Sequence, residues 1–191
     1  MNTNSVAANS PYLANQEKLI ASIKNHFPQH DLQMDKLNEP ILWAKDPKDY
    51  FKMIQLLKNT KDFNLNYLSD LTAYDNVDQK DGEKRFVIVV QLYSLDLFTR
   101  LRIKLNVSET ENVPTLFKVH PAANWLEREV YDMYGVIFDH HPNLRRIMMD
   151  ERFTGHPLRK EYPMKQREAF SDNIRIHLGS HDLPTKEHKN E

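Results

Sequence analysis

The N-terminal part of the chain contains two stretches with the apolar spacing of an amphipathic helix. In residues 15–27 the apolar side chains lie on one helical face: Leu19, Ile20, Ile23 and Phe27. Pro28 ends this predicted helix, because proline cannot continue it. A second helix is predicted after Asp46, a good N-cap residue, with Pro47 at its first position. Its apolar stripe is Tyr50, Met53, Ile54 and Leu57.

Five further segments have the pattern of strands. Residues 31–37 and 41–44 flank a turn-favouring stretch and predict a hairpin, and three longer segments are rich in β-branched and aromatic residues: 65–74, 84–93 and 98–107. In the last of these, Arg100, Arg102 and Lys104 alternate with apolar residues, as in a strand with one wet and one buried face. This order of elements predicts a two-layer α+β fold, with helices on one face of a mainly antiparallel sheet.

The C-terminal part changes in character after one more helix. Residues 121–134 have a helical pattern, in which Arg128 and Asp132 are spaced to pair and Gly135 is placed to end the helix in a left-handed conformation. Beyond it the chain is rich in Pro, His and Arg, which predicts an extended segment. We therefore divide the chain into a flexible N-terminus (1–13), an α+β domain (14–135), an extended partner-binding segment (136–163) and a C-terminal tail (164–191).

Composition removes several classes of function. Among 191 residues, 26 Lys and Arg face 27 Asp and Glu, so the broad positive charge of most nucleic-acid-binding proteins is absent. The chain has no cysteine, which excludes thiolate iron–sulfur or zinc ligation and thiol catalysis in this chain. Its four glycines form no phosphate-binding loop. The N-terminus has no signal or transit pattern and no segment predicts a membrane helix, so we expect a cytoplasmic setting.

Candidate chemistry is concentrated in residues 124–163. Glu127 and Glu129 are two residues apart and point in different directions on a helix, which is a poor geometry for an acid–base pair. We expect these carboxylates on the helix surface, neutralised by nearby arginines: Arg128, Arg145 and Arg146. The histidines lack metal-ligand spacing, and we expect them to bind backbone carbonyls at turns. A stand-alone metal-dependent hydrolase and a nucleic-acid-binding module remain the alternative functions.

This region resembles a known signature. The matching residues are Glu127-Arg128-Glu129, Asp132, Gly135, Phe138, His141-Pro142, Leu144-Arg145-Arg146-Ile147 and His156-Pro157-Leu158-Arg159-Lys160-Glu161-Tyr162-Pro163. They are similar to the signature of the 30 kDa (C) subunit of the proton-pumping NADH:quinone oxidoreductase, respiratory complex I. Upstream, residues 68–75 and 85–87 also resemble the family's sheet region. Two departures are His140, where glycine is common in the family, and Phe153-Thr154, where Trp-Glu is usual.

The resemblance implies a structural subunit of the hydrophilic arm of complex I. It implies no catalytic residue, cofactor or metal in this chain, with FMN and iron–sulfur clusters in partner subunits. The implied partners are chiefly the subunits D, B and I, of which B and I bear clusters, on the cytoplasmic side of the bacterial inner membrane. Association with the membrane would then be only through the complex. The signature residues are expected to form an interface between subunits, with Arg128 internal to the domain and Arg145 or Arg146 facing a partner.

Overall fold

The computed structural model describes residues 11–76 and 84–163. Three helices are present in this part of the chain, α1 (Pro11–His26), α2 (Pro47–Asn59) and α3 (Ala123–Tyr134). The larger sheet contains β1 (Leu32–Met34), β2 (Pro40–Ala44), β3 (Tyr67–Asp75), β4 (Phe86–Ser94) and β5 (Thr99–Val107). The short strands β6 (Val113–Pro114) and β7 (Phe138–Asp139) form a separate parallel pair. None of the described helices is both long and apolar enough to cross a membrane.

The five-stranded sheet has the order β1-β2-β5-β4-β3. The pairs β1–β2, β3–β4 and β4–β5 are antiparallel, whereas β2 and β5 are parallel. The prediction of a hairpin followed by three strands in a mainly antiparallel sheet is confirmed. The parallel pairing arises because the N-terminal hairpin lies beside the last strand of the meander, and the sequence pattern did not indicate it.

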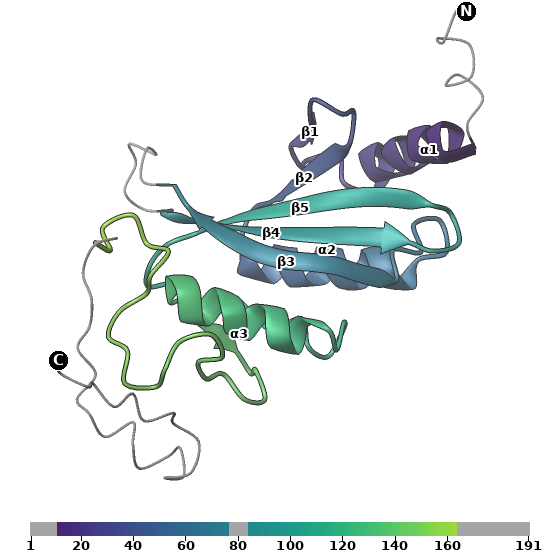
Figure 1. Ribbon diagram of the computed structural model, residues 1–191. Helices are drawn as coiled ribbons and strands as arrows, with labels where there is room; N and C mark the ends of the chain where they lie inside the picture. The colour runs from purple at the N-terminus through teal and green to yellow at the C-terminus, as the bar shows by residue number, and fades with distance from the viewer. Residues whose placement is uncertain (1–10, 77–83, 164–191) are drawn as a thin grey trace, which may run out of the picture.

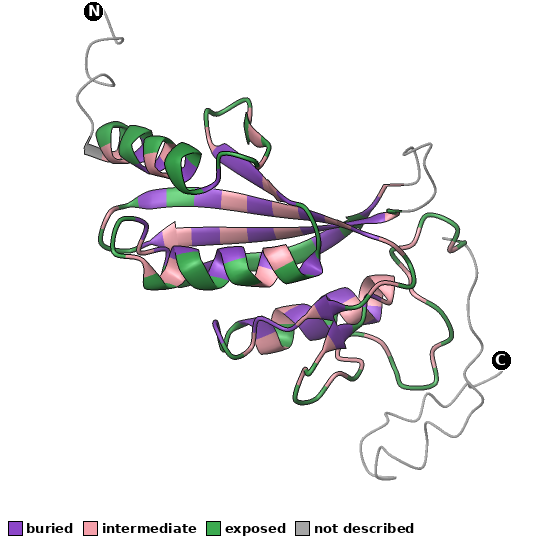
Figure 2. Cartoon of the chain, turned by 180° about the vertical axis from the view of Figure 1, so that it is seen from behind, coloured by how far each residue is buried: buried purple, intermediate pink, exposed green. Residues whose placement is uncertain are grey.

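Two helices, α1 and α2, lie on one face of the sheet, and α3 packs along its β3 edge (Figure 1). The predicted α+β fold, with helices on one face of the sheet, is confirmed. The inward side chains of β4 and β5 alternate with outward ones, and the bands of buried and partly exposed residues along these strands are visible in Figure 2. One continuous core joins this face to all three helices, through side chains such as Ile23, Ile54 and Val130. Burial of these apolar side chains supplies the main stabilising free energy of the domain.

The second helix forms as its sequence predicts. The side chain of Asp46 accepts a hydrogen bond from the backbone N–H of Asp49 at 2.8 Å, and Pro47 occupies the first helical position. The first helix begins at Pro11, earlier than the predicted start at Asn15, so residues 11–13 belong to its first turn and not to a flexible lead-in. Residues 1–10 and the predicted tail, 164–191, lie outside the described residues.

A side chain of α1 completes the hydrogen bonding of β5 beyond the end of β2. The amide of Gln16 donates to the carbonyl of Arg100 at 2.7 Å and accepts from the N–H of the same residue at 3.1 Å. Gln16 is buried, and β2 pairs with β5 only from Arg102 onward. Gln16 therefore takes the place that a further residue of β2 would occupy.

Replacing Gln16 by alanine should lower the free energy of unfolding by about 1 to 3 kcal/mol, because two backbone groups of Arg100 lose their partners where little water reaches them. Urea unfolding of the full chain measures this change. Gln55→Ala, at an exposed position of α2, is the matched control and should lie within about 0.5 kcal/mol of the parent protein. Equal stability of the two variants would contradict the pairing role of Gln16.

Candidate functional site

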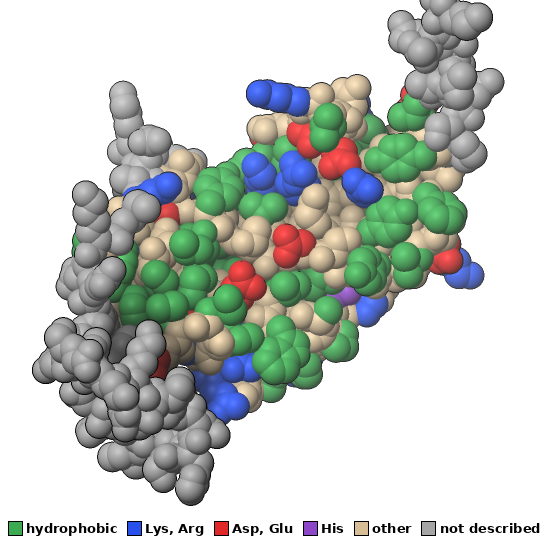
Figure 3. Space-filling view, in the orientation of Figure 1, with side chains coloured by type: hydrophobic (Ala, Val, Ile, Leu, Met, Phe, Trp, Pro, Cys, Tyr) green, Lys and Arg blue, Asp and Glu red, His purple; other side chains and the backbone are tan. Residues whose placement is uncertain are grey.

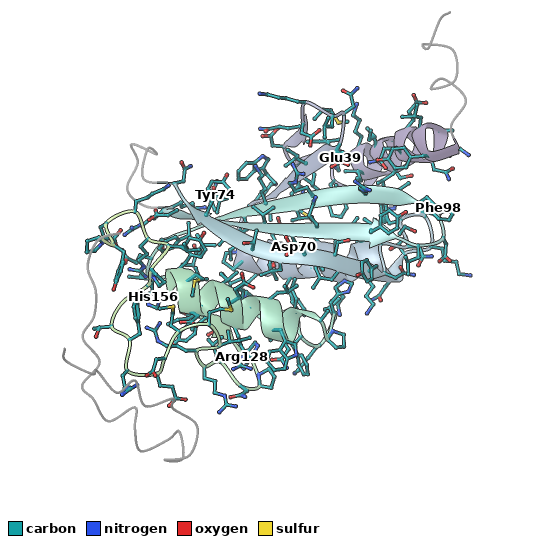
Figure 4. The ribbon with its side chains drawn as sticks, viewed as in Figure 1. Glu39, Asp70, Tyr74, Phe98, Arg128 and His156 are labelled. Carbon is teal, nitrogen blue, oxygen red and sulfur yellow. The ribbon has the colours of Figure 1, made fainter. Side chains whose placement is uncertain are left out.

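The signature residues form one structure, in which residues 144–163, here called the strap, cross the end of α3 (Figure 4). Strap groups bind the last carbonyls of the helix, which have no partner within it. His156 Nδ1–H donates to the carbonyl of Asp132 at 3.0 Å, the N–H of Leu158 to that of Met133 at 3.1 Å, and Arg159 Nε–H to that of Tyr134 at 2.7 Å. The strap is thus the C-terminal cap of α3.

Gly135 allows this close approach. It has φ +80°, the left-handed conformation predicted for the residue that ends the helix. A Cβ atom at this position would lie 2.5 Å from His156 Nε2 and 2.6 Å from Arg159 NH2. Any side chain here would push the strap away from the helix, so both the backbone conformation and the lack of a side chain are required.

The carboxylate of Asp132 organises the beginning of the strap. Its Oδ2 atom accepts hydrogen bonds from three consecutive backbone N–H groups, those of Ile147, Met148 and Met149, at 3.0, 2.7 and 2.9 Å. Its Oδ1 atom pairs with Arg146 NH1 at 2.7 Å. Burial alone would raise the pKa of Asp132, but these donors outweigh it and hold the pKa below its usual value.

The arginines do not all have the predicted partners. Arg128 is buried, as predicted, but it donates to the backbone carbonyls of Arg145 and Arg146, both at 3.1 Å, and does not pair with Asp132. Arg146 takes that carboxylate and also donates to the carbonyl of Gly155 at 2.7 Å. The Arg145 side chain is exposed, with no hydrogen bond or ion pair to any residue in the described part of the chain. Among the signature arginines, Arg145 is therefore the one whose side chain has no partner within the described residues.

The expectation that Glu127 lies on the helix surface beside arginines is wrong. Its side chain is fully buried and pairs with no arginine of the described ranges, whereas Glu129 is exposed. The hydroxyl of Thr115 donates to Glu127 Oε2 at 2.5 Å and the N–H of Leu116 to Oε1 at 2.6 Å. Burial raises the pKa of Glu127 to about 7, although both hydrogen bonds act in the opposite direction. The α3 residue Glu127 thereby ties the helix to the segment that follows β6.

His141 lies beside Glu127 and bears out the prediction for histidines at turns. Its Nε2–H donates to the carbonyl of Asn124 at 3.1 Å, and its Nδ1 accepts from the N–H of Asn143 at 3.1 Å. Both ring nitrogens are thus occupied in the neutral form. The Glu127 carboxylate is 3.8 Å from Nε2, and burial lowers the pKa of His141. His141 therefore fixes the loop that includes Pro142 against the start of α3.

The far end of the strap is attached to the sheet by residues not included among the candidate site residues. Asp75 at the end of β3 accepts from the backbone N–H of Lys160 at 2.9 Å and pairs with Arg85 NH2 at 2.6 Å. Arg85 also pairs with Glu161, and Arg159 pairs with Glu109. The hydrogen bonds from Arg85 hold the pKa of Asp75 below its usual value. Asp75 and Arg85 both lie in the upstream segments that resemble the family. That resemblance was the sequence feature that could have identified them as part of the site.

The remaining signature residues shape the strap itself. The ring of Tyr162 packs on Phe153, with centroids 5.5 Å apart, near Gly155. Pro157 is half-buried and Pro163 is exposed. His140 has φ +62°, a conformation that glycine adopts more easily, which gives a physical reason for the glycine common in the family.

The hollow beside the strap is small. The strap borders an open depression of about 210 Å³, lined by Gly155, His156, Arg159, Glu161, Tyr162 and Pro163. This volume is below the range typical of small-molecule sites. Within residues 11–76 and 84–163, no group of three or more His, Asp or Glu side chains is placed to hold a metal ion. The arrangement instead presents a fixed segment of chain with Arg145 and the apolar side chains of Trp125, Met148 and Leu158 exposed.

Asp132→Asn should lower the free energy of unfolding by about 3 to 5 kcal/mol, because Arg146 loses its buried counter-ion and strap N–H groups lose their acceptor. Urea unfolding of the full chain is the measurement. Glu129→Gln, on the exposed side of the same helix, should change the stability by less than about 0.5 kcal/mol. A similarly small effect of Asp132→Asn would show that the carboxylate does not hold the strap.

Glu127 should make the protein less stable as the pH rises. Its pKa is about 7 in the folded chain against 4.5 in the unfolded one, so the protonated form is favoured by folding. The resulting stabilisation is complete at low pH and is lost as the pH rises through about 7. Between about pH 5 and pH 8 the stability of Glu127→Gln should therefore improve relative to the parent by about 1 to 3 kcal/mol. If the free energy of unfolding changes with pH in the same way for Glu127→Gln and the parent, this prediction is wrong. Glu129→Gln is the control, and its curve of stability against pH should run parallel to that of the parent.

Comparison with known proteins shows the family of the chain. The family described as "Respiratory-chain NADH dehydrogenase, 30 Kd subunit" matches residues 44–168. The C subunit of NADH-quinone oxidoreductase from Geobacter metallireducens is 36% identical over 154 residues, 80% of this chain and 93% of the relative. That of Geotalea uraniireducens is 36% identical over 165 residues, 85% of this chain and 98% of the relative.

A solved structure supports the fold. A chain of the membrane-bound sulfane sulfur reductase, an archaeal respiratory membrane complex, superposes with a TM-score of 0.65 at 18% sequence identity. The match covers 92% of this chain and 98% of the other. The family match and the two bacterial relatives confirm the resemblance seen in the sequence. The chain belongs to the family of the 30 kDa (C) subunit of respiratory-chain NADH dehydrogenase, complex I.

Proposed function

We propose that this chain is a structural subunit of the hydrophilic arm of complex I. In that complex, electrons pass from NADH through FMN and iron–sulfur clusters of partner subunits to quinone, coupled to proton translocation. The chain itself supplies no catalytic residue, cofactor or metal ligand. It lies on the cytoplasmic side of the bacterial inner membrane and is attached through the complex. Its family membership and its lack of cysteine support this role.

The observation that carries the proposal is the way the strap is held. Its backbone and its charged groups Arg146 and Arg159 bind groups of the chain's own domain, at α3 and at the end of β3. On its outer side the strap exposes Arg145, which is unpaired within the described residues, and several apolar side chains. A surface already ordered loses little conformational entropy on binding, which favours a protein interface. We assign the strap and the exposed side of α3 to contacts with neighbouring subunits, chiefly D, B and I.

The role of the chain is then to position neighbouring subunits. Electron transfer depends on fixed distances between cofactors, and a rigid subunit that touches several cofactor-bearing chains maintains them. The guanidinium of Arg145 presents a planar pair of donors that matches a carboxylate. A partner carboxylate that binds it becomes desolvated on assembly. Loss of either member would then weaken the interface more than loss of an exposed surface pair.

Arg145→Ala should weaken assembly of the complex without lowering the stability of the subunit itself. Its thermal unfolding should match the parent protein, because the Arg145 side chain has no partner within the described residues. Incorporation into complex I in membranes should weaken by about 2 to 5 kcal/mol if the partner carboxylate is buried. Arg146→Ala is the matched comparison and should lower the stability of the subunit itself, because it removes the partner of Asp132.

Purification in mild detergent and quantification of this chain in the flavin and iron–sulfur assembly measure incorporation. The proposed function fails if the parent chain does not copurify with that assembly. The interface role of Arg145 fails if Arg145→Ala is incorporated as well as the parent chain.

A further inference from the structure

The face of the sheet opposite the helices carries a second surface, separate from the strap (Figure 3). No described helix covers it in Figure 1, and Figure 3 shows charged side chains among hydrophobic ones there. The outward side chains of β5 supply three cations in a row, Arg100, Arg102 and Lys104. Across the strands, Lys104 lies in register with Trp43 of β2 and Val89 of β4. We call the surface around this row the Lys104 face.

The cations of this face are not equally neutralised. Arg100 pairs with Glu39 at 3.1 Å, and Arg102 pairs with Asp35 at 3.3 Å, both carboxylates of the β1–β2 hairpin. Lys104 has no carboxylate within 4.0 Å among the residues that the structure describes. One unbalanced positive charge therefore lies next to two balanced ones.

Two aromatic rings flank Lys104 and partly shield it from water. Its Nζ atom lies 5.3 Å from the ring centroid of Trp43 and 5.7 Å from that of Tyr74, which Figure 4 labels on β3. Lys104 is half-buried, and burial together with the charge of Arg102 lowers its pKa. The indole N–H of Trp43 is also buried without a partner in the described residues. Because the indole N–H is closed off from solvent, the half-buried Lys104 ammonium is the donor that a carboxylate from outside could reach.

We propose that the Lys104 face docks another member of the complex, which places a single Asp or Glu side chain on Lys104 and apolar groups over Trp43 and Tyr74. This inference rests on the proposed function, since the partner is a member of the same assembly. A carboxylate would offset the unfavourable burial of the ammonium, and the charges here do not match other occupants. Nucleic acid would need several free cations, whereas Arg100 and Arg102 are already paired. A second copy docked by the same face, with Lys104 near the twofold axis, would bring two unpaired ammonium groups together.

Cross-linking of the assembled complex tests the contact directly. A carbodiimide joins an amine to a carboxylate that touches it, so it should link Lys104 to an Asp or Glu of a different subunit, identified by mass spectrometry of the joined peptides. Lys104→Arg keeps the charge but has no amine to couple, so the same joined peptide should disappear. A link from Lys104 to a second copy of this chain, or to residues 164–191 of the same chain, would overturn the proposal.

Acetylation adds a measurement that needs no cross-link. In the assembled complex Lys104 should react with acetic anhydride about tenfold or more slowly than in the isolated chain, whereas Lys52, on the exposed side of α2, should react similarly in both. When the chain is limiting, Lys104→Met should lower incorporation by about tenfold, and Lys104→Arg should restore most of it. Equal reactivity of Lys104 in both states, with normal incorporation of Lys104→Met, would refute the proposal while the parent chain still copurifies with the complex. Failure of the parent chain to copurify would instead refute the proposed function.

Discussion

The buried carboxylate of Asp132 is the interaction on which the signature surface of this protein depends. It lies on α3, accepts three successive backbone N–H groups of the strap and pairs with Arg146. The strap has too few apolar side chains to form a core of its own. Its conformation is therefore fixed by hydrogen bonds to a helix that the core already holds. The order of dependence runs from the apolar packing of α3, to Asp132, to the strap, and finally to the groups that the strap exposes.

The other contacts of the strap also hold it against the folded domain through hydrogen bonds. The carbonyls at the end of α3 are bound by His156, Leu158 and Arg159, and Gly135 provides the space that this requires. At the far end, Asp75 extends the attachment to the sheet. Most polar groups of the signature are thus used to build the subunit. The few that are not used within the described residues, of which Arg145 is the clearest, are the ones available to a partner.

Local rules predicted the helices, the hairpin and the three long strands, because those features depend on nearby residues. Asp46 and Pro47 begin α2, and Gly135 ends α3, as their types predict. The pairing of the charges could not be predicted in the same way. The spacing of Arg128 and Asp132 favours a pair on an isolated helix, but the strap supplies backbone donors and acceptors that both residues prefer. The burial of Glu127 depends on Thr115, which is brought to α3 by the pairing of β6 with β7, a contact between distant segments.

Amide hydrogen exchange of the isolated full chain is the most direct test of this order of dependence. If α3 organises the strap before any partner binds, the N–H groups of Ile147, Met148, Met149 and Leu158 exchange slowly, with protection that follows that of the α3 amides as denaturant is added. If these amides exchange at the rate of unprotected chain in the isolated protein and become protected only in the assembled complex, a partner and not Asp132 orders the strap. That result would contradict the order of dependence that runs from α3 through Asp132 to the strap.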